Sequence, residues 1–328
     1  MTELSDLKRL SACVGADPLL VQAAGGNTSL KQDGVMWIKA SGTWLKDAAI
    51  RDIFVPIDRE ALLAALKKND PACETCTGFV LSGLHTTGLR PSIETTVHAL
   101  MPQRVVLHVH CVNTIAWAIQ SDAEQKLAEK LKDFRWAFIP YAKPGLPLAG
   151  AISARLKPGI DVLILGNHGL VVAADSVAAV DALLERIVTA LARSVRLVPS
   201  PDLEVLNSIS KGTAYAPSKS SETHALALDT FALASGRNAA FYPDHVVFLG
   251  VGVATEISSG AALVAIAGKG VLIRNDAKPA MEPMGRCLAD VMRRVGEDST
   301  LIALNDRDID SLVNWDAEKY RQDLKSDN

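Results

Sequence analysis

Val105-Val106-Leu107-His108-Val109 decides the fold, because a run of β-branched and leucine residues with one polar interruption is typical of a strand buried on both faces. A second run of this kind, Val162–Leu165, follows further along the chain. Segments with helical periodicity surround both runs, among them Glu3–Val14 and Ser176–Val195. The alternation of buried strands with amphipathic helices predicts an α/β fold, a layered sheet flanked by helices.

The composition changes after the last of these helices. Val198-Pro-Ser-Pro201 and the stretch Lys211–Glu222 are rich in proline, serine and lysine, as a connection between domains would be. We therefore expect a first domain over residues 1–198 and a smaller α/β domain over residues 199–328. Elements predicted in the second domain are a helix near Ala225–Ala234, strands at His245–Leu249, Ala262–Ala267 and Gly270–Ile273, and a helix around Met284–Val295.

The charge balance excludes some classes of partner. The 328 residues carry a formal net charge of −3, with 48% hydrophobic and 22% charged side chains, so no strong attraction to nucleic acid or an acidic membrane is expected. No apolar run approaches the ~20 residues that cross a bilayer, and the N-terminal residues lack an apolar signal segment. Five cysteines are too few for a disulfide scaffold. We therefore expect a cytoplasmic protein.

Three histidines form a candidate metal site. His108 and His110 occupy alternate positions of the first buried strand, so their side chains leave the same face. Neutral imidazoles suit zinc or a similar divalent ion, although a pair of hydrogen-bonded structural histidines is the alternative. His168 follows the second buried strand, and functional groups gather at strand ends in α/β folds. Three nitrogen ligands would leave positions open for substrate, as at a catalytic metal.

Two further features are candidates for catalysis and binding. Glu94 and His98 lie one helical turn apart, where Glu94 could be a general acid/base beside a metal. Alternatively, the helix dipole favours Glu94 at a helix start and His98 is its surface partner. The loops Gly25–Ser29 and Ser41–Thr43 offer backbone N–H groups and hydroxyls that could hold a phosphate, although either could be a plain turn.

In their order along the chain, these segments resemble the class II aldolase/adducin family. The motif string is Gly26-Asn27-x-Ser29, Ser41-Gly42, Pro91-Ser92-x-Glu94 with His98, His108-x-His110 and Asn167-His168-Gly169. Within the family, the stretches Gly25–Lys31 and Trp37–Gly42 are most similar to the aldolase part of the bifunctional rhamnulose-1-phosphate aldolase/alcohol dehydrogenases. The glycine fingerprint of a dinucleotide-binding domain is absent from the sequence.

The resemblance implies a set of site residues and a cofactor. His108, His110 and His168 would hold Zn²⁺, or another divalent cation such as Mn²⁺, Co²⁺ or Ni²⁺, and Glu94 would be the catalytic acid/base. Family members usually form homo-oligomers, most often tetramers, with active sites between subunits. The residues that would bind the phosphate of a sugar phosphate are Asn27, Thr28, Ser41, Gly42 and Ser92.

The implied reaction is retro-aldol cleavage of a ketose phosphate, a carbon–carbon lyase reaction through a metal-stabilised enediolate. A sugar-phosphate 4-epimerase, a keto-acid decarboxylase and a non-catalytic binding module like adducin are alternatives on the same scaffold. Two departures from the family pattern affect the phosphate site. Ser92-Ile93-Glu94 replaces a common Ser-Ser-Glu, which removes one hydroxyl, and Lys39-Ala40 replaces a common Thr-Pro.

Overall fold

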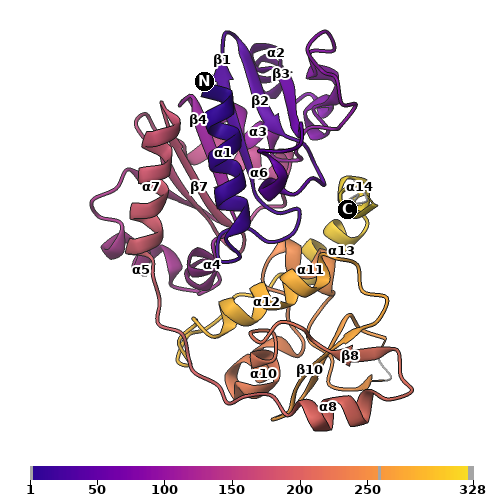
Figure 1. The fold of residues 1–328 in the computed structure, drawn as a ribbon. Helices are drawn as coiled ribbons and strands as arrows, with labels where there is room; N and C mark the ends of the chain where they lie inside the picture. Colours follow the sequence, from indigo (N-terminus) through magenta and orange to yellow (C-terminus); the bar gives the residue numbers. More distant parts are fainter. Residues whose placement is uncertain (1–2, 258–259, 324–328) are drawn as a thin grey trace.

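The structure is a computed structural model that describes residues 3–257 and 260–323. The chain forms two β-sheets, one before and one after the proline-rich segment around Val198, and they lie in the upper and lower parts of Figure 1. The residues before this segment form a sheet of seven strands, and those after it form a sheet of three. The predicted α/β fold with a smaller C-terminal α/β part is therefore confirmed. The division into domains at Val198 stays a prediction.

The seven-stranded sheet has the order β3-β2-β1-β4-β7-β6-β5, and only the pair β5 and β6 is parallel. Its strands are β1 (Asn27–Gln32), β2 (Val35–Lys39), β3 (Phe54–Asp58), β4 (Val105–Val109), β5 (Trp136–Ile139), β6 (Val162–Leu165) and β7 (Gly169–Ala174). Both buried runs that the sequence predicts as strands, β4 and β6, are confirmed. β1 begins at Asn27, inside the predicted loop, because residues 27–30 pair with β4.

Helices cover both faces of this sheet. They are α1 (Glu3–Ala16), α2 (Arg59–Leu66), α3 (Thr95–Leu100), α4 (Val112–Ala118), α5 (Ala123–Lys130), α6 (Leu146–Arg155) and α7 (Val177–Ala190). Ser176 caps α7, as its side chain accepts a hydrogen bond from the Ala179 N–H. The helix ends before the predicted Val195 because the Leu191 carbonyl accepts a hydrogen bond from the Trp117 indole of α4 instead.

Alternation along β4 directs its side chains to the two faces of the sheet. Leu107 and Val109 lie in the core cluster formed with α1 and α7. Val106 lies in the cluster formed with α3 and α6 on the opposite face. Because strand side chains alternate, His108 and His110 project toward the side of α3. The start of α3 therefore faces the two histidines.

The second unit is built around the sheet β8-β10-β9. Its elements are α8 (Leu203–Ser210), β8 (Tyr215–Pro217), α9 (Ala225–Leu228), α10 (Thr230–Gly236), α11 (Pro243–Leu249), β9 (Leu263–Ile266), β10 (Gly270–Arg274), α12 (Met281–Met292), α13 (Asp306–Val313) and α14 (Asp316–Asp323). The predicted helix Ala225–Ala234 is two helices, because Asp229 adopts an extended backbone and caps α10.

The predicted strand His245–Leu249 is wrong, since these residues belong to helix α11. Pro243 occupies the first turn of α11, where its fixed φ favours a helix and its missing N–H has no cost. Asp244 and His245 are buried together with Val246, Phe248 and Leu249, so the helix has no exposed polar face that periodicity could reveal.

The two units share a hydrophobic core. Ile115 and Ile119, in or next to α4, lie in the same buried cluster as Met284 and Leu288 of α12. The second unit is thus packed directly against the first.

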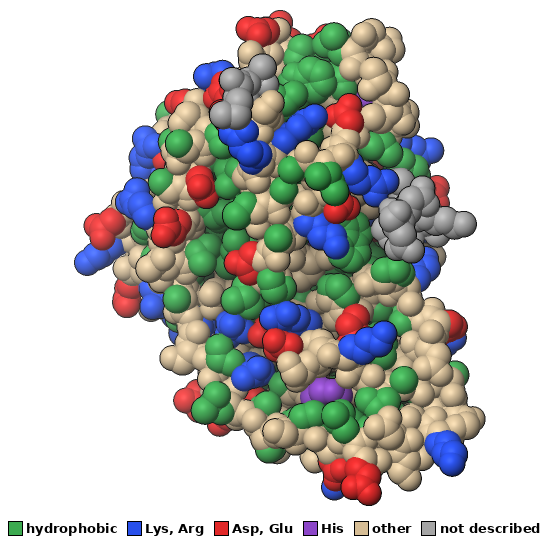
Figure 2. Space-filling model, viewed as in Figure 1, with side chains coloured by type: hydrophobic (Ala, Val, Ile, Leu, Met, Phe, Trp, Pro, Cys, Tyr) green, Lys and Arg blue, Asp and Glu red, His purple; other side chains and the backbone are tan. Residues whose placement is uncertain are grey.

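On the face shown in Figure 2, acidic and basic side chains are interspersed without a broad patch of one sign. No helix in the described part of the chain has both the length and the apolar character needed to span a membrane.

Candidate functional site

The three predicted histidines meet at one end of the large sheet. His108 and His110 come from β4 and its end, and His168 sits in the turn between β6 and β7. Pairing of β4 with β7 brings these segments together. All three side chains are buried, and their candidate ligand atoms lie within 4.8 Å of one another. A site with these ligands is geometrically possible in the described chain.

The hydrogen bonds of two of these rings fix their tautomers. His108 Nδ1 lies 3.0 Å from the Leu170 carbonyl oxygen, and His110 Nδ1 lies 3.0 Å from Asp244 Oδ2. Both oxygens accept, so each Nδ1 donates and each Nε2 of a neutral ring carries a lone pair. The two Nε2 atoms face each other across 3.1 Å. Burial lowers the pKa of His108 to about 4, so its ring is neutral at pH 7. With both rings neutral in these tautomers, the two Nε2 lone pairs would point toward a shared cation.

Glu94 borders the histidine cluster from the start of α3. Its Oε1 lies 3.3 Å from His168 Nε2, and its Oε2 lies 3.3 Å from His108 Nε2. Burial alone would raise the pKa of Glu94, but attraction to His108, His168 and His110 outweighs it and lowers the pKa to about 2. Among the described residues, Oε1 has no hydrogen-bond donor. The carboxylate is therefore ionised, with one oxygen available for a proton.

A buried hydrogen-bond chain holds Glu94 in place. His98 Nδ1 lies 2.7 Å from Ser29 Oγ, and His98 Nε2 donates to Asn27 Oδ1. Asn27 Nδ2 then donates to Glu94 Oε2 at 2.7 Å and to Ser92 Oγ at 3.2 Å. The alternative of a surface His98 is wrong, because the side chain is fully buried and orients Asn27.

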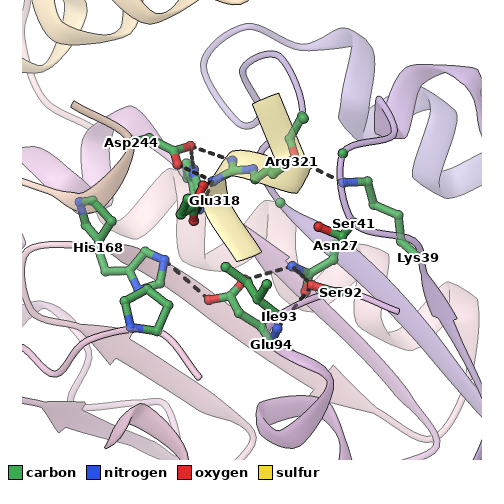
Figure 3. Close-up of a pocket in the computed structure, with 16 residues that line it drawn as sticks. Asn27, Lys39, Ser41, Ser92, Ile93, Glu94, His168, Asp244, Glu318 and Arg321 are labelled. Atoms are coloured by element: carbon green, nitrogen blue, oxygen red, sulfur yellow. Dashed lines mark hydrogen bonds and ion pairs between the residues drawn. The ribbon is translucent and has the colours of Figure 1, made fainter. Parts of the chain in front are cut away.

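A cavity of about 20 Å³ adjoins the cluster (Figure 3). Four of the five residues predicted to hold a phosphate line it, namely Asn27, Ser41, Gly42 and Ser92. Lys39, Glu94 and His168 line the same space. The cavity therefore joins the candidate metal ligands to the candidate phosphate-binding loops.

Thr28 does not belong to this set. Its hydroxyl lies 2.7 Å from Ser11 Oγ of α1, on the other face of the sheet. Thr28 pairs with Leu107 in the register between β1 and β4, and Leu107 also faces α1. Strand alternation thus places Asn27 in the cavity and Thr28 behind the sheet, which corrects the sequence-based prediction.

Lys39 is a functional candidate that the sequence analysis notes only as a departure from the family pattern. Its Nζ donates to the Ala24 carbonyl oxygen at 3.0 Å, and no carboxylate of the described residues forms an ion pair with it. Burial, followed by repulsion from Arg321, lowers the pKa of Lys39 to about 7. A buried ammonium without a counter-ion is costly unless an anion joins it. The available signal was a charged side chain at the end of the apolar strand Val35–Lys39.

The second unit contributes charged groups that the sequence analysis did not assign. Asp244, at the start of α11, and Glu318 and Arg321 of α14 line the cavity. Burial would raise the pKa of Asp244, but Arg321 and His110 hold it well below its usual range. Asp244 lies in the stretch Tyr242-Pro243-Asp244-His245, to which the sequence assigns no role, and nothing in the sequence singles out Arg321.

Two glycines of the motif string make room for the histidines. A Cβ at Gly25 would lie 2.9 Å from His110 Nδ1 and 2.8 Å from the Gln22 carbonyl oxygen. A Cβ at Gly169 would lie 2.6 Å from the Val109 carbonyl oxygen. Real Cβ atoms do not approach other atoms so closely, so a larger residue at either position would shift the site. Glycine is therefore required at both positions for steric reasons, whether or not a phosphate binds nearby.

Together, the fold and the site define an α/β protein with a buried three-histidine candidate metal centre. Residues 15–194 match the model of the Class II Aldolase and Adducin N-terminal domain, which is more than half of the chain. The chain belongs to the class II aldolase and adducin family.

The chain is also similar to individual proteins, at sequence identities below 30%. Over 183 residues the chain is 27% identical to YuxG of Bacillus subtilis, described as an uncharacterized oxidoreductase, covering 51% of this chain and 26% of that protein. The chain thus spans about a quarter of the length of this curated relative. The structure of the N-terminal class II aldolase domain of a conserved protein from Thermoplasma acidophilum is 26% identical, with a TM-score of 0.49, covering 57% of this chain and 90% of that one. The sugar-phosphate aldolase of Thermotoga maritima is 14% identical, with a TM-score of 0.42, covering 58% and 91%.

Proposed function

We propose that this chain is a metal-dependent carbon–carbon lyase that cleaves a ketose phosphate by a retro-aldol reaction. His108, His110 and His168 hold a divalent ion, for which zinc is the first candidate because all three ligands are imidazoles. The observation that carries the proposal is the convergence of three buried imidazoles, whose candidate ligand atoms lie within 4.8 Å of one another beside Glu94. Membership of the aldolase and adducin family supports it.

A divalent ion in this position supplies Lewis acidity, which stabilises negative charge as it develops on substrate oxygens. Glu94 moves the proton to and from the substrate carbon, as a general acid/base. Asn27 Nδ2 donates to Glu94 Oε2 at 2.7 Å, whereas Glu94 Oε1 accepts no hydrogen bond from the described residues. The transferred proton is therefore carried by Oε1. The hydrogen-bond chain through His98 keeps this carboxylate orientation fixed.

The anionic end of the substrate binds on the other side of the cavity. Ser41, Gly42 and Ser92 supply hydroxyls and a backbone N–H, and Lys39 supplies a positive charge. Two of the three Nζ–H donors of Lys39 are without a partner among the described residues. This ammonium compensates for the serine hydroxyl that Ile93 replaces in the family pattern. A phosphate at this position would give Lys39 the counter-ion that it lacks.

Products separate this proposal from its alternatives. The purified protein is incubated with a panel of ketose 1-phosphates and 5-phosphates, and carbonyl fragments such as dihydroxyacetone phosphate are measured. We expect two carbonyl fragments from one of these substrates, no cleavage after chelator treatment, and recovery when Zn²⁺ is added. A rearranged pentulose phosphate would instead identify an epimerase, and carbon dioxide from a keto acid would identify a decarboxylase. No turnover of any substrate would favour a binding module.

We also propose that the protein is a homo-oligomer, with a tetramer as the first candidate, and that it acts in the cytoplasm. Family membership supports the oligomer. All five cysteines are unpaired, which supports a reducing compartment. Light scattering coupled to size-exclusion chromatography tests the assembly, because a tetramer has four times the 34.9 kDa mass of one chain.

A further inference from the structure

A carboxylate of the second unit contacts a candidate metal ligand of the first. Asp244 Oδ2 lies 3.0 Å from His110 Nδ1, and both side chains are buried. This contact fixes the tautomer that leaves His110 Nε2 free to bind a metal. The absence of a side chain at Gly25 permits the approach, since a Cβ there would lie 3.3 Å from Asp244 Oδ2 and 2.9 Å from His110 Nδ1.

Arg321 of α14 holds this carboxylate from the other side. Its Nη1 donates to Asp244 Oδ1 at 2.6 Å, and its Nη2 donates to Oδ2 at 2.9 Å. Such a two-point contact fixes the plane of the carboxylate as well as its position. The guanidinium also lies over the Phe248 ring, 5.2 Å from its centre, and Tyr320 of the same helix lies against Arg90. The helix is thereby anchored on both units.

The turn that carries His168 is tied to the second unit by a separate contact. Asn167 adopts a left-handed backbone with φ of 52°. Its Nδ2 donates to the carbonyl oxygens of Phe241 and Ile302, at 2.9 and 2.7 Å. Both acceptors lie in the second unit, beyond residue 194, where the family match ends. Two of the three candidate ligands are therefore supported from outside the matched domain.

We infer that Asp244 and Arg321 are positioning residues for the metal ligand His110, so that the second unit of this chain is a working part of the metal site. The inference rests on the metal binding proposed above and assigns the second unit a role. Asp244 accepts the hydrogen bond of His110 Nδ1, and the two-point contact with Arg321 keeps the Asp244 carboxylate oriented. Partners of this kind typically change metal affinity by ~10–100-fold when they are removed.

Cobalt binding tests this inference without any assay of catalysis. Chelator-treated protein is titrated with Co²⁺ at pH 7.5, and affinity is measured together with the visible absorption spectrum of the bound ion. We expect Asp244→Asn to weaken binding by ~10–100-fold and to shift the spectrum. Asp244→Glu keeps the carboxylate and is expected to retain more affinity than Asp244→Asn.

Asp276→Asn is the matched control. Asp276 also forms a two-point contact with an arginine, Arg274, but both lie on the surface of the second unit. We expect this variant to bind Co²⁺ like the wild type. If Asp244→Asn does not fold, Arg321→Gln decides, with weaker Co²⁺ binding expected.

Three results would contradict the inference in different ways. If the wild type binds Co²⁺ and Asp244→Asn binds it with the same affinity and spectrum, the positioning role is wrong and the proposed function stands. A wild type that binds neither Co²⁺ nor Zn²⁺ overturns both. A drop in melting temperature that is equal with and without metal, at unchanged Co²⁺ affinity, shows that Asp244 is only a structural residue.

Discussion

Asn27 and His108 lie directly opposite each other on the neighbouring antiparallel strands β1 and β4. Asn27, which holds Glu94, and His108, a candidate metal ligand, therefore lie on the same face of the sheet. Glu94 bridges them, 2.7 Å from Asn27 Nδ2 and 3.3 Å from His108 Nε2. The sheet register thus sets the distance between Glu94, the proposed proton-transfer group, and His108, a proposed metal ligand.

Glu94→Gln is expected to slow cleavage by ~10²–10⁴-fold, because the amide cannot accept the proton that the carboxylate carries. The metal content is expected to be unchanged, since the three histidines remain. Steady-state rates and metal analysis of the same preparation check both statements. Metal loss as large as that of a histidine variant would instead make Glu94 a ligand.

Lys39→Met is expected to weaken the binding of inorganic phosphate by ~10–100-fold, because a hydrogen bond to a charged group contributes ~1.5–3 kcal/mol. Isothermal titration calorimetry on the metal-loaded protein measures this affinity. Lys31→Met is the control, since Lys31 also donates to a backbone carbonyl but does not line the cavity. Equal affinities for wild type and Lys39→Met would remove Lys39 from the anion site.

Phosphate affinity is also expected to depend on pH through Lys39. Its pKa is lowered to about 7, so the ammonium is present below this pH and is lost as the pH rises above it. Phosphate binding by the wild type should therefore weaken between pH 6.5 and 8.5. The same titrations with Lys39→Met should show a smaller decline, and parallel declines would contradict the assignment.

Acid is expected to destabilise the metal-free protein through its buried histidines. Burial lowers the pKa of His245 to about 3, below the ~6.5 of an unfolded histidine. Below pH 6.5 the unfolded chain therefore binds more protons, so stability is complete above that pH and is lost as the pH falls toward 3. Urea unfolding at pH 7.5 and 5 measures the loss. His245→Gln, which has no ring to protonate, should show a smaller pH dependence, and an equal one would exclude His245 as a cause.

Thr28→Val tests the position of Thr28 behind the sheet. The change leaves the buried Ser11 hydroxyl without its partner, so we expect a loss of ~1–3 kcal/mol in the free energy of unfolding. The KM for the phosphorylated substrate should stay the same. A raised KM at unchanged stability would return Thr28 to the phosphate site.

The sequence predicts the histidine cluster because its signals are local. His108 and His110 share a face through strand alternation, and β4 and β6 are apolar runs of ordinary strand length. Strand alternation would also have placed Asn27 and Thr28 on opposite faces of the sheet. The sequence did not reveal this, because the start of β1 at Asn27 depends on pairing with β4, which is distant in the sequence.

The contribution of the second unit could not be predicted in the same way. The contact between Asp244 and Arg321 joins two helices through charge, and no periodicity links them. The apolar run after Asp244 predicts a strand, but packing on all sides makes it the buried helix α11. Tertiary contacts therefore determined this half of the site.

Metal analysis of the purified protein tests the central claim most directly. Wild-type protein and His168→Ala are stripped with chelator, reloaded with Zn²⁺, desalted and measured by plasma mass spectrometry. The three-histidine site predicts close to one ion per chain in the wild type and almost none in His168→Ala, with both proteins folded. A wild type without zinc, or a His168→Ala variant that retains it fully, would contradict this site.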